Sequence, residues 1–428
     1  MKALKSLCLS LLITAGALAG ASEQSFPMNI NPALLYYQAF LVAPDPLPQA
    51  EWDYLSSYER RSQPLPARYE GILGGYDNQF RLVRQAGHAT APCDWGTDLS
   101  AGPATLLPQL APAKAVMVAT RLRLAWHLQH GRQAQACDDL LAALKLARSL
   151  PRNGLLISVL VQGALESIAS FMVAENFNQF SPEALQRLAA GLEALPPRGT
   201  VVGCMPAEKA LSQDWLLRRI DELQRANPGD DAKVMAGIRE LFAPMFDVLV
   251  SRWLKEKAEE AGWWERLVQA AGGTSEGVVR LIRDLDPFDQ ELAGVLALPY
   301  GEYQEPMKQL KAETQQSSNP LLGLGLTFWE NSRDKELKAQ VNVAMVRAAL
   351  EYKLHGQAAL QSVTDPCGQG PFGFRRFIFQ GVDRGFELKS ACPLNPWPYV
   401  MIFVEKEGPL FYTDGRYAGQ ARPRTEPK

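Results

Sequence analysis

The chain has 428 residues, of which 47% are hydrophobic and 21% are charged, and its formal net charge is −2. These proportions are ordinary for a folded globular protein, and they exclude a chain that is disordered over most of its length. The slightly acidic balance and the absence of a Lys/Arg cluster argue against a nucleic-acid-binding protein, which needs a basic face to contact phosphates. The length exceeds the size at which a single core stops growing, so we expect two domains.

The first 21 residues have the three parts of a secretory signal peptide. Lys2 and Lys5 precede the apolar run Leu7–Ala19, and small residues follow it. Cleavage is expected near Ala21, which places the mature protein in the periplasm, outside the cell or on its surface. Cys8 lies inside the apolar run, so no cysteine stands where a lipid would be attached.

Residues 22–330 are predicted to form a body of antiparallel helices, and its opening segment, 22–112, is irregular and rich in proline. Asn31 followed by Pro32 is a good N-cap and first-turn pair for a short helix that reaches Val42. After this segment, apolar residues recur at helical spacing on both sides of Gly131, which predicts an antiparallel helical hairpin. Further helices are expected from Leu155, from the cap Ser181-Pro182, around Leu216, around Val234, over 248–261 and over 278–285.

One proline and one apolar run qualify this prediction. Pro244 is expected to break or kink the helix that begins around Val234. The stretch Leu155–Val173 is long enough to span a bilayer, but Glu166 near its centre would cost several kcal/mol in lipid. We therefore interpret it as a buried helix of the bundle and expect no membrane-spanning segment in the mature chain.

Residues 331–419 are predicted to form a long helix and a small antiparallel sheet. Leu337, Val341, Ala344, Ala348 and Tyr352 lie on one helical face, and Gly356 follows as a C-terminal cap. Runs of aromatic and branched residues then predict strands over 374–379, 386–390, 399–404 and 410–412. The fold class is thus mostly α with a small C-terminal α+β tail, and residues 420–428 are expected to be disordered.

Five cysteines remain after cleavage of the signal peptide, and none of their spacings is CxxC. Cys367 and Cys392 flank a short strand-rich stretch, so we expect them to form a disulfide in an oxidising compartment. Closing a loop of this length would stabilise the tail by about 3 kcal/mol in the chain-entropy model. Two buried thiols are the alternative.

The tail resembles that of major type II secretion pseudopilins. The resemblance lies in Asp365-Pro366, Gly368, Pro371-Phe372, Arg375 and the stretch Gly385–Ser390. It covers about a fifth of the chain, and one extra residue separates the glycine from the proline. Because the pilin-like helix lies near the C-terminus and no calcium loop is recognisable, the resemblance implies a fold for the tail but neither filament assembly nor a metal.

The chain as a whole is similar to large secreted bacterial helical proteins of unknown function that share such a tail. The segments that carry this similarity are Tyr36–Phe40, Cys93–Trp95 and Ala147-Arg148. It implies an exported helical protein and no particular activity.

Glu166 is the one candidate catalytic residue. A carboxylate on an apolar helix must be neutral or paired if it is buried. We expect a structural ion pair with an arginine of the preceding hairpin, Arg121 or Arg148, in preference to a catalytic acid. A second carboxylate for glycosidase chemistry is not identified, although Asp214 and Glu222 are available.

His127 and His130 lie three residues apart on one helix and are the candidate metal ligands. A zinc site needs a third ligand, yet the sequence has no HExxH motif. We therefore expect surface or interhelical histidines, with no metal or other cofactor.

Two further patterns have a functional and a structural interpretation. Trp253, Trp263 and Trp264 could form an amphipathic surface that contacts a membrane or a partner, but core packing is the simpler interpretation. The glycines of Leu321–Leu326 lack the third glycine and the preceding strand of a nucleotide-binding loop, so this stretch is interpreted as an apolar loop or the start of a helix.

The leading functional hypothesis is a non-enzymatic binding or scaffold protein of the cell envelope that contacts another envelope protein. The alternative is an extracytoplasmic hydrolase with a site near Glu166. A cluster of buried, convergent polar residues would favour the hydrolase, whereas a long apolar groove or a flat aromatic patch would favour the binding protein.

Overall fold

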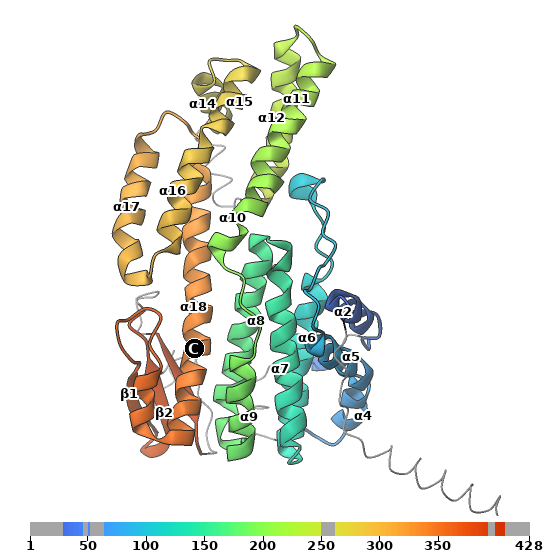
Figure 1. The fold of residues 1–428 in the computed structure, drawn as a ribbon, viewed down its shortest axis with the longest axis vertical. Coiled ribbons are helices and arrows are strands. Elements are labelled where there is room, and N and C mark those ends of the chain that lie inside the picture. Colours follow the sequence, from blue (N-terminus) through green and yellow to red (C-terminus); the bar gives the residue numbers. More distant parts are fainter. Residues whose placement is uncertain (1–28, 46–49, 52–63, 250–261, 393–398, 407–428) are drawn as a thin grey trace, which may run out of the picture.

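The computed structural model describes residues 29–45, 50–51, 64–249, 262–392 and 399–406 (Figure 1). The predicted signal peptide, most of the helix predicted over 248–261 with Trp253, the strand predicted over 410–412 and the tail 420–428 lie outside these residues. The described part is mostly helical, with a three-stranded antiparallel sheet near the C-terminus, which confirms the predicted fold class.

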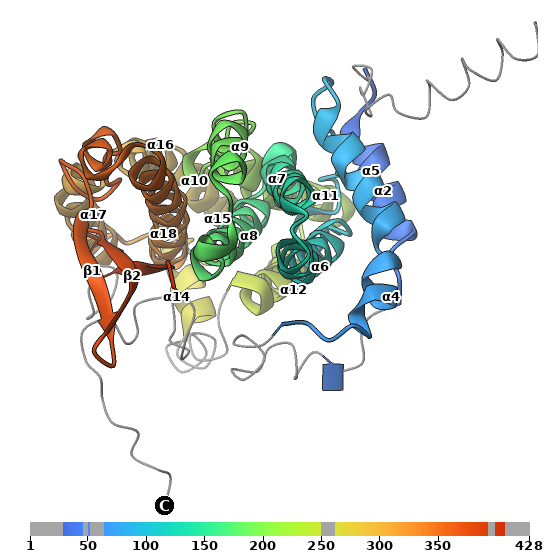
Figure 2. The same cartoon turned by 90° about the horizontal axis from the view of Figure 1, so that it is seen from below.

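A row of long helices forms the centre of the molecule. In Figure 2 the order runs from α5 through α7, α8 and α18 to the sheet, and neighbouring members of this row are in contact. The helices in and around the first part of the row are α2 (Pro32–Leu41), α4 (Tyr69–Gly74), α5 (Asp77–His88), α6 (Leu110–Gln129), α7 (Gln133–Ser149), α8 (Leu156–Glu175) and α9 (Pro182–Glu193).

The predicted caps and turns of this part are present. The Asn31 side chain accepts a hydrogen bond from the Ala33 amide, and Ser181 accepts one from Ala184. α6 and α7 form the predicted antiparallel hairpin, whose turn contains Gly131 with a φ of 68°. Glycine adopts a positive φ more readily than other residues, which explains why a glycine lies at this turn.

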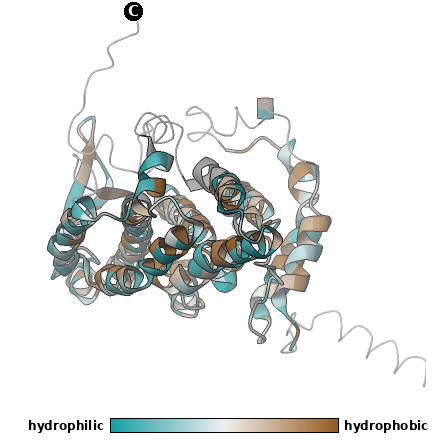
Figure 3. Cartoon of the chain, turned by 90° about the horizontal axis from the view of Figure 1, so that it is seen from above, coloured by the Kyte–Doolittle hydropathy of each residue, from teal (hydrophilic) through white to brown (hydrophobic). Residues whose placement is uncertain are grey.

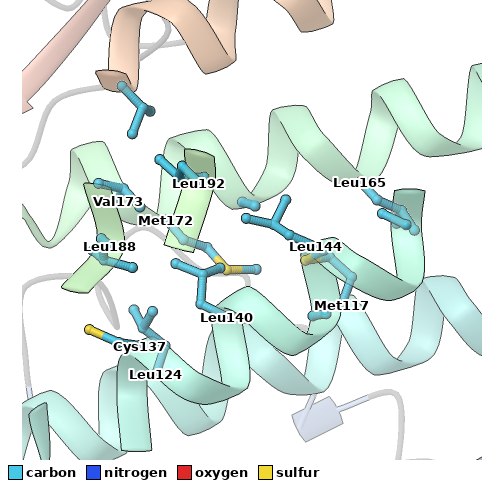
Figure 4. Packing of buried hydrophobic residues seen from close by; sticks show 14 of the residues in the cluster. Met117, Leu124, Cys137, Leu140, Leu144, Leu165, Met172, Val173, Leu188 and Leu192 are labelled. Carbon is cyan, nitrogen blue, oxygen red and sulfur yellow. The ribbon is translucent and has the colours of Figure 1, made fainter. Parts of the chain in front are cut away.

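One hydrophobic core joins these helices. Leucine, methionine and valine side chains of α6, α7, α8 and α9 interdigitate between the ribbons (Figure 4). In a view along the bundle, hydrophilic residues gather on the outer sides of the helices and hydrophobic residues between them (Figure 3). α8 is the one described helix that is long and apolar enough to cross a membrane, and 61% of its most apolar window is buried inside the protein. Its burial agrees with the prediction of a core helix.

A second group of helices lies at the other end of the molecule (Figure 1). It has two hydrophobic clusters of its own, one around Ile238 and Leu267 and one around Leu292 and Met307. The group comprises α10 (Val201–Lys209), α11 (Trp215–Ala226), α12 (Asp231–Leu249), α14 (Trp263–Ala270), α15 (Ser275–Arg283), α16 (Leu285–Ala297) and α17 (Tyr300–Gln316).

α12 differs from the prediction, because it continues through Pro244 without a break. A proline removes one hydrogen bond of a helix, and neighbouring contacts can compensate for that loss. Trp263 is buried in the cluster of this group, with its ring 5.5 Å from that of Phe242. This position supports the core interpretation of that tryptophan.

α18 (Leu322–His355) spans both groups, since a helix of 34 residues is about 51 Å long. Gly356 caps its end as predicted. The apolar stretch Leu321–Leu326 is therefore the start of this helix, which begins nine residues earlier than the predicted boundary at residue 331.

The sheet consists of β1 (Gly373–Phe379), β2 (Val382–Lys389) and β3 (Val400–Val404), in that order. Phe386 on the central strand is buried, with its ring 4.6 Å from Tyr352 of α18 and 5.1 Å from Phe403. Gly385 is required, because a Cβ there would lie 2.0 Å from the Phe403 carbonyl oxygen. The tail thus shares the main hydrophobic core with the helical body.

Candidate functional site

Glu166 is fully buried and lies between two arginines. Its Oε1 accepts a hydrogen bond from Nε of Arg148, and its Oε2 accepts one of 2.7 Å from Nη2 of Arg198. Arg148 was one of the two expected partners; Arg121 instead contacts Glu175 at 2.5 Å. Arg198 was missed because it follows Pro196-Pro197 in a connection whose path the sequence pattern does not reveal.

These contacts hold the segment that connects α9 and α10 against the helical bundle. Arg148 also donates to the Pro196 carbonyl at 2.9 Å, and the Gln162 side chain accepts from the Gly199 amide at 3.0 Å. Both oxygens of Glu166 are occupied, and the hollow beside Arg148 has a volume of about 20 Å³, which is space for about one water molecule. The arrangement supports a structural role for Glu166.

His127 and His130 do not converge on a common point. His127 is buried, with Nε2 3.4 Å from Asp139 Oδ2, whereas Nδ1 of His130 is 2.8 Å from the Trp126 carbonyl oxygen. Within the described ranges, no group of three His, Cys, Asp or Glu side chains is arranged to hold a metal ion.

Asp139 is instead the centre of a second buried charge network. Its carboxylate accepts a 2.7 Å hydrogen bond from Arg123 and one of 2.6 Å from Arg84. Burial acts to raise the pKa of Asp139, but His127 and the two arginines outweigh it and hold the pKa below its usual value. Arg123 also lies over the Phe80 ring, 4.5 Å from its centroid. This network joins α5, α6 and α7.

The predicted disulfide between Cys367 and Cys392 is present, with the two Cα atoms 5.0 Å apart. Asp365, in the stretch that resembles the pseudopilin loop, organises the same region. Its buried carboxylate accepts hydrogen bonds from the Cys367 and Ala391 amides at 3.0 and 2.6 Å, and from the Ser390 hydroxyl. The role of this motif in the structure is to hold the loop against the end of β2.

A pocket of about 510 Å³ lies where the two hydrophobic clusters of the second helical group meet. Its volume falls in the range of small-molecule sites, about 300–1,000 Å³. One wall is formed by the first two turns of α18, with Leu322, Gly325, Phe328 and Trp329. Phe242 of α12 and Ile282 of α15 extend this wall. These residues make the wall almost entirely apolar.

The polar residues that line the pocket come from the end of α10, from the single π-helical turn Ala210–Asp214 that follows it, and from α16, which also contributes apolar side chains such as Phe288. Lys209 Nζ lies 3.0 Å from Asp286 Oδ1 and 3.2 Å from Asp214 Oδ1. Next to this contact, Gln213 donates a 2.5 Å hydrogen bond to Asp289 Oδ2. Lys209 thus joins the end of α10 to α16, and Gln213 joins the π-helical turn to α16. Single π-helical turns are frequent at functional sites.

Two carboxyl groups of the pocket have raised pKa values. Burial raises the pKa of Asp289, and the hydrogen bond from Gln213 only partly opposes it. Burial likewise raises the pKa of Glu208, whose Oε1 accepts a 2.7 Å hydrogen bond from the Leu156 amide. Perturbed carboxyl groups in an apolar pocket are typical of functional sites.

The sequence analysis did not identify this site. Asp214 was considered as an available carboxylate and Leu321–Leu326 as a helix start, but nothing in the sequence brings 205–216, 282–293 and 321–329 together. The sequence does contain one local pattern that points to the site. One face of α16 is defined by residues at helical spacing, namely Asp286, Asp289, Gln290 and Ala293.

No family model, no curated protein and no solved structure matches the chain.

Proposed function

We propose that this chain is an exported, non-enzymatic binding protein of the cell envelope, and that it holds a small apolar ligand in the pocket between α10, α16 and α18. The observation that carries this proposal is a cavity of about 510 Å³ that is lined mostly by apolar side chains, together with a few polar groups that are already held in place. Pockets of this composition are the usual sites of small-molecule binding. Contact with another envelope protein stays a prediction from the sequence.

The contacts of Glu166 do not support the alternative hypothesis, a hydrolase with its active site near this residue. Both of its carboxylate oxygens face arginines. Among the described residues, His127 lies against Asp139 and His130 against the Trp126 carbonyl oxygen. A general acid must reach a substrate atom directly or through one water molecule. Glu166 is enclosed instead by the bundle.

Export rests on the N-terminal segment, which has a charged start, an apolar run and small residues at its end. We expect N-terminal sequencing of protein recovered from the periplasm or the medium to begin within a few residues of Ser22, since the apolar run ends in small residues suited to cleavage. Recovery of the chain from the cytoplasm with Met1 intact would contradict export.

Ligand binding in the pocket can be tested by a substitution on α18 whose larger side chain fills part of the cavity. A Cβ at Gly325 would lie 3.6 Å from the Trp329 ring, an ordinary contact, so a leucine there can extend into the cavity without a backbone clash. We expect wild-type protein to bind the uncharged fluorophore N-phenyl-1-naphthylamine with a rise in its fluorescence. Gly325→Leu is expected to weaken this binding by about tenfold or more, because the side chain occupies the space of the ligand.

Gly323→Leu is the matched control. Gly323 lies on the same turn of α18, is exposed and has no atom within 4 Å of its Cβ position. Both substitutions remove a helix-interior glycine, so both gain about the same helix propensity, near 1 kcal/mol. Equal binding by the two variants would place the fluorophore elsewhere, and no binding by the folded wild-type protein would refute the proposed function.

A further inference from the structure

We infer that the ligand is a small amphiphile with an apolar body and a cationic amine head, and that Asp289 receives the ammonium group. This inference rests on the proposed function, because it names the chemistry of the ligand in the same pocket. Three features of the pocket carry it: its charge balance, the contacts of Asp289, and the apolar side chains that form most of the lining.

The charged residues that line the pocket are mostly acidic. They are Glu208, Asp286 and Asp289, against Lys209 as the single basic residue. The Lys209 ammonium already lies within 3.2 Å of two carboxylates, those of Asp286 and Asp214. Its charge is therefore neutralised locally, and the pocket as a whole favours a cation over an anion.

Two carboxylates in this group, Glu208 and Asp289, have no lysine or arginine partner among the described residues. Oε1 of Glu208 accepts the hydrogen bond from the Leu156 amide, and we assign the ammonium group to Asp289 on α16. Its hydrogen bond comes from the neutral amide of Gln213, and no lysine or arginine nitrogen of the described chain lies within 4.0 Å of its oxygens. Burial raises the pKa of Asp289, and the nearby charge of Lys209 opposes this effect only weakly. A bound ammonium would supply the missing partner, since hydrogen bonds between charged groups are about twice as strong as neutral ones.

The residues that line the pocket also indicate the chemistry of the rest of the ligand. Asp286 and Asp289 lie one helical turn apart on α16 and face the pocket together with the π-helical turn. Phe328 and Trp329 form the apolar wall on α18. An amphiphile can satisfy the polar groups and the apolar lining at once, whereas a fully polar amine would leave the apolar lining in contact with water.

The test compares three ligands with the same decyl chain, each added below its micelle concentration to displace N-phenyl-1-naphthylamine. Decylammonium is expected to displace the fluorophore at about tenfold lower concentration than 1-decanol or decyl sulfate. Asp289→Asn is expected to remove most of this advantage and to leave displacement by 1-decanol unchanged. The asparagine oxygen can still accept the hydrogen bond from Gln213, so the pocket should keep its structure.

Glu291→Gln is the matched control, because Glu291 lies on the same helix, is exposed and does not line the pocket. It should keep the full advantage of decylammonium, which would exclude a general effect of net charge. Equal displacement by all three ligands, or strongest displacement by decyl sulfate, would overturn the inference while leaving the proposed function intact. Retention of the advantage in Asp289→Asn would overturn the assignment of Asp289.

Discussion

Substitution of Glu166 by glutamine is expected to lower the free energy of unfolding by about 3–5 kcal/mol, the usual cost of removing one member of a buried ion pair. Glu166 is fully buried, and the Nε of Arg148 and the Nη2 of Arg198 both donate to its carboxylate. Glutamine keeps the shape but not the charge, so two largely buried guanidinium groups would lose the carboxylate that they share. Urea unfolding followed by circular dichroism would measure the loss.

Glu175→Gln is the control for this prediction. It makes the same chemical change on the same helix, but the contact of Glu175 with Arg121 lies near the surface, with the two side chains 20% and 40% exposed. Surface ion pairs contribute about 0–1 kcal/mol, so this variant should be close to wild type. Equal stability of the two variants would show that Glu166 does not hold the bundle together.

Substitution of Asp139 by asparagine is the second large effect, with an expected loss of about 3 kcal/mol or more. Asp139 is buried, and Arg123 and Arg84 hydrogen-bond to its two oxygens. The adjacent Asp138 supplies the control, because its pair with Arg187 is exposed, and Asp138→Asn should change stability by less than about 1 kcal/mol.

The same network predicts an acid dependence of stability. The pKa of Asp139 is held below its usual value in the folded protein. A carboxyl group with a depressed folded pKa stabilises the native state at any pH above its unfolded pKa, about 3.9, and this stabilisation is lost as the pH falls through the folded pKa. The difference in stability between wild type and Asp139→Asn should therefore shrink below about pH 4. A difference that stays constant down to pH 2 would contradict the assigned role of the carboxylate.

Much of the fold was predictable, because each element carries a local signal. Asn31 and Ser181 cap the helices that they were expected to cap, and Gly131 and Gly356 mark a turn and a helix end. These features depend on backbone hydrogen bonds within a few residues. The break predicted at Pro244 is absent, because one proline removes a single backbone hydrogen bond and α12 continues on both sides of it.

The candidate site was less accessible to sequence reasoning, because it is made of contacts between distant segments. Glu166 was recognised as a buried, paired carboxylate because the apolar residues of its own helix indicate burial. Arg148, one of its two partners, was predicted because it lies in the preceding hairpin. The pocket depends on the approach of α16 to α10 and α18, and the separate charged residues Lys209, Asp286 and Asp289 are indistinguishable in sequence from a solvated helix surface.

The central claim is that the pocket between α10, α16 and α18 receives the apolar body of a ligand. The most direct measurement is a crystal structure of the protein with bound decylammonium. The account predicts an alkyl chain against Phe328 and Trp329, with the ammonium nitrogen about 3 Å from an oxygen of Asp289. An empty pocket in crystals that hold the ligand at another surface would contradict it.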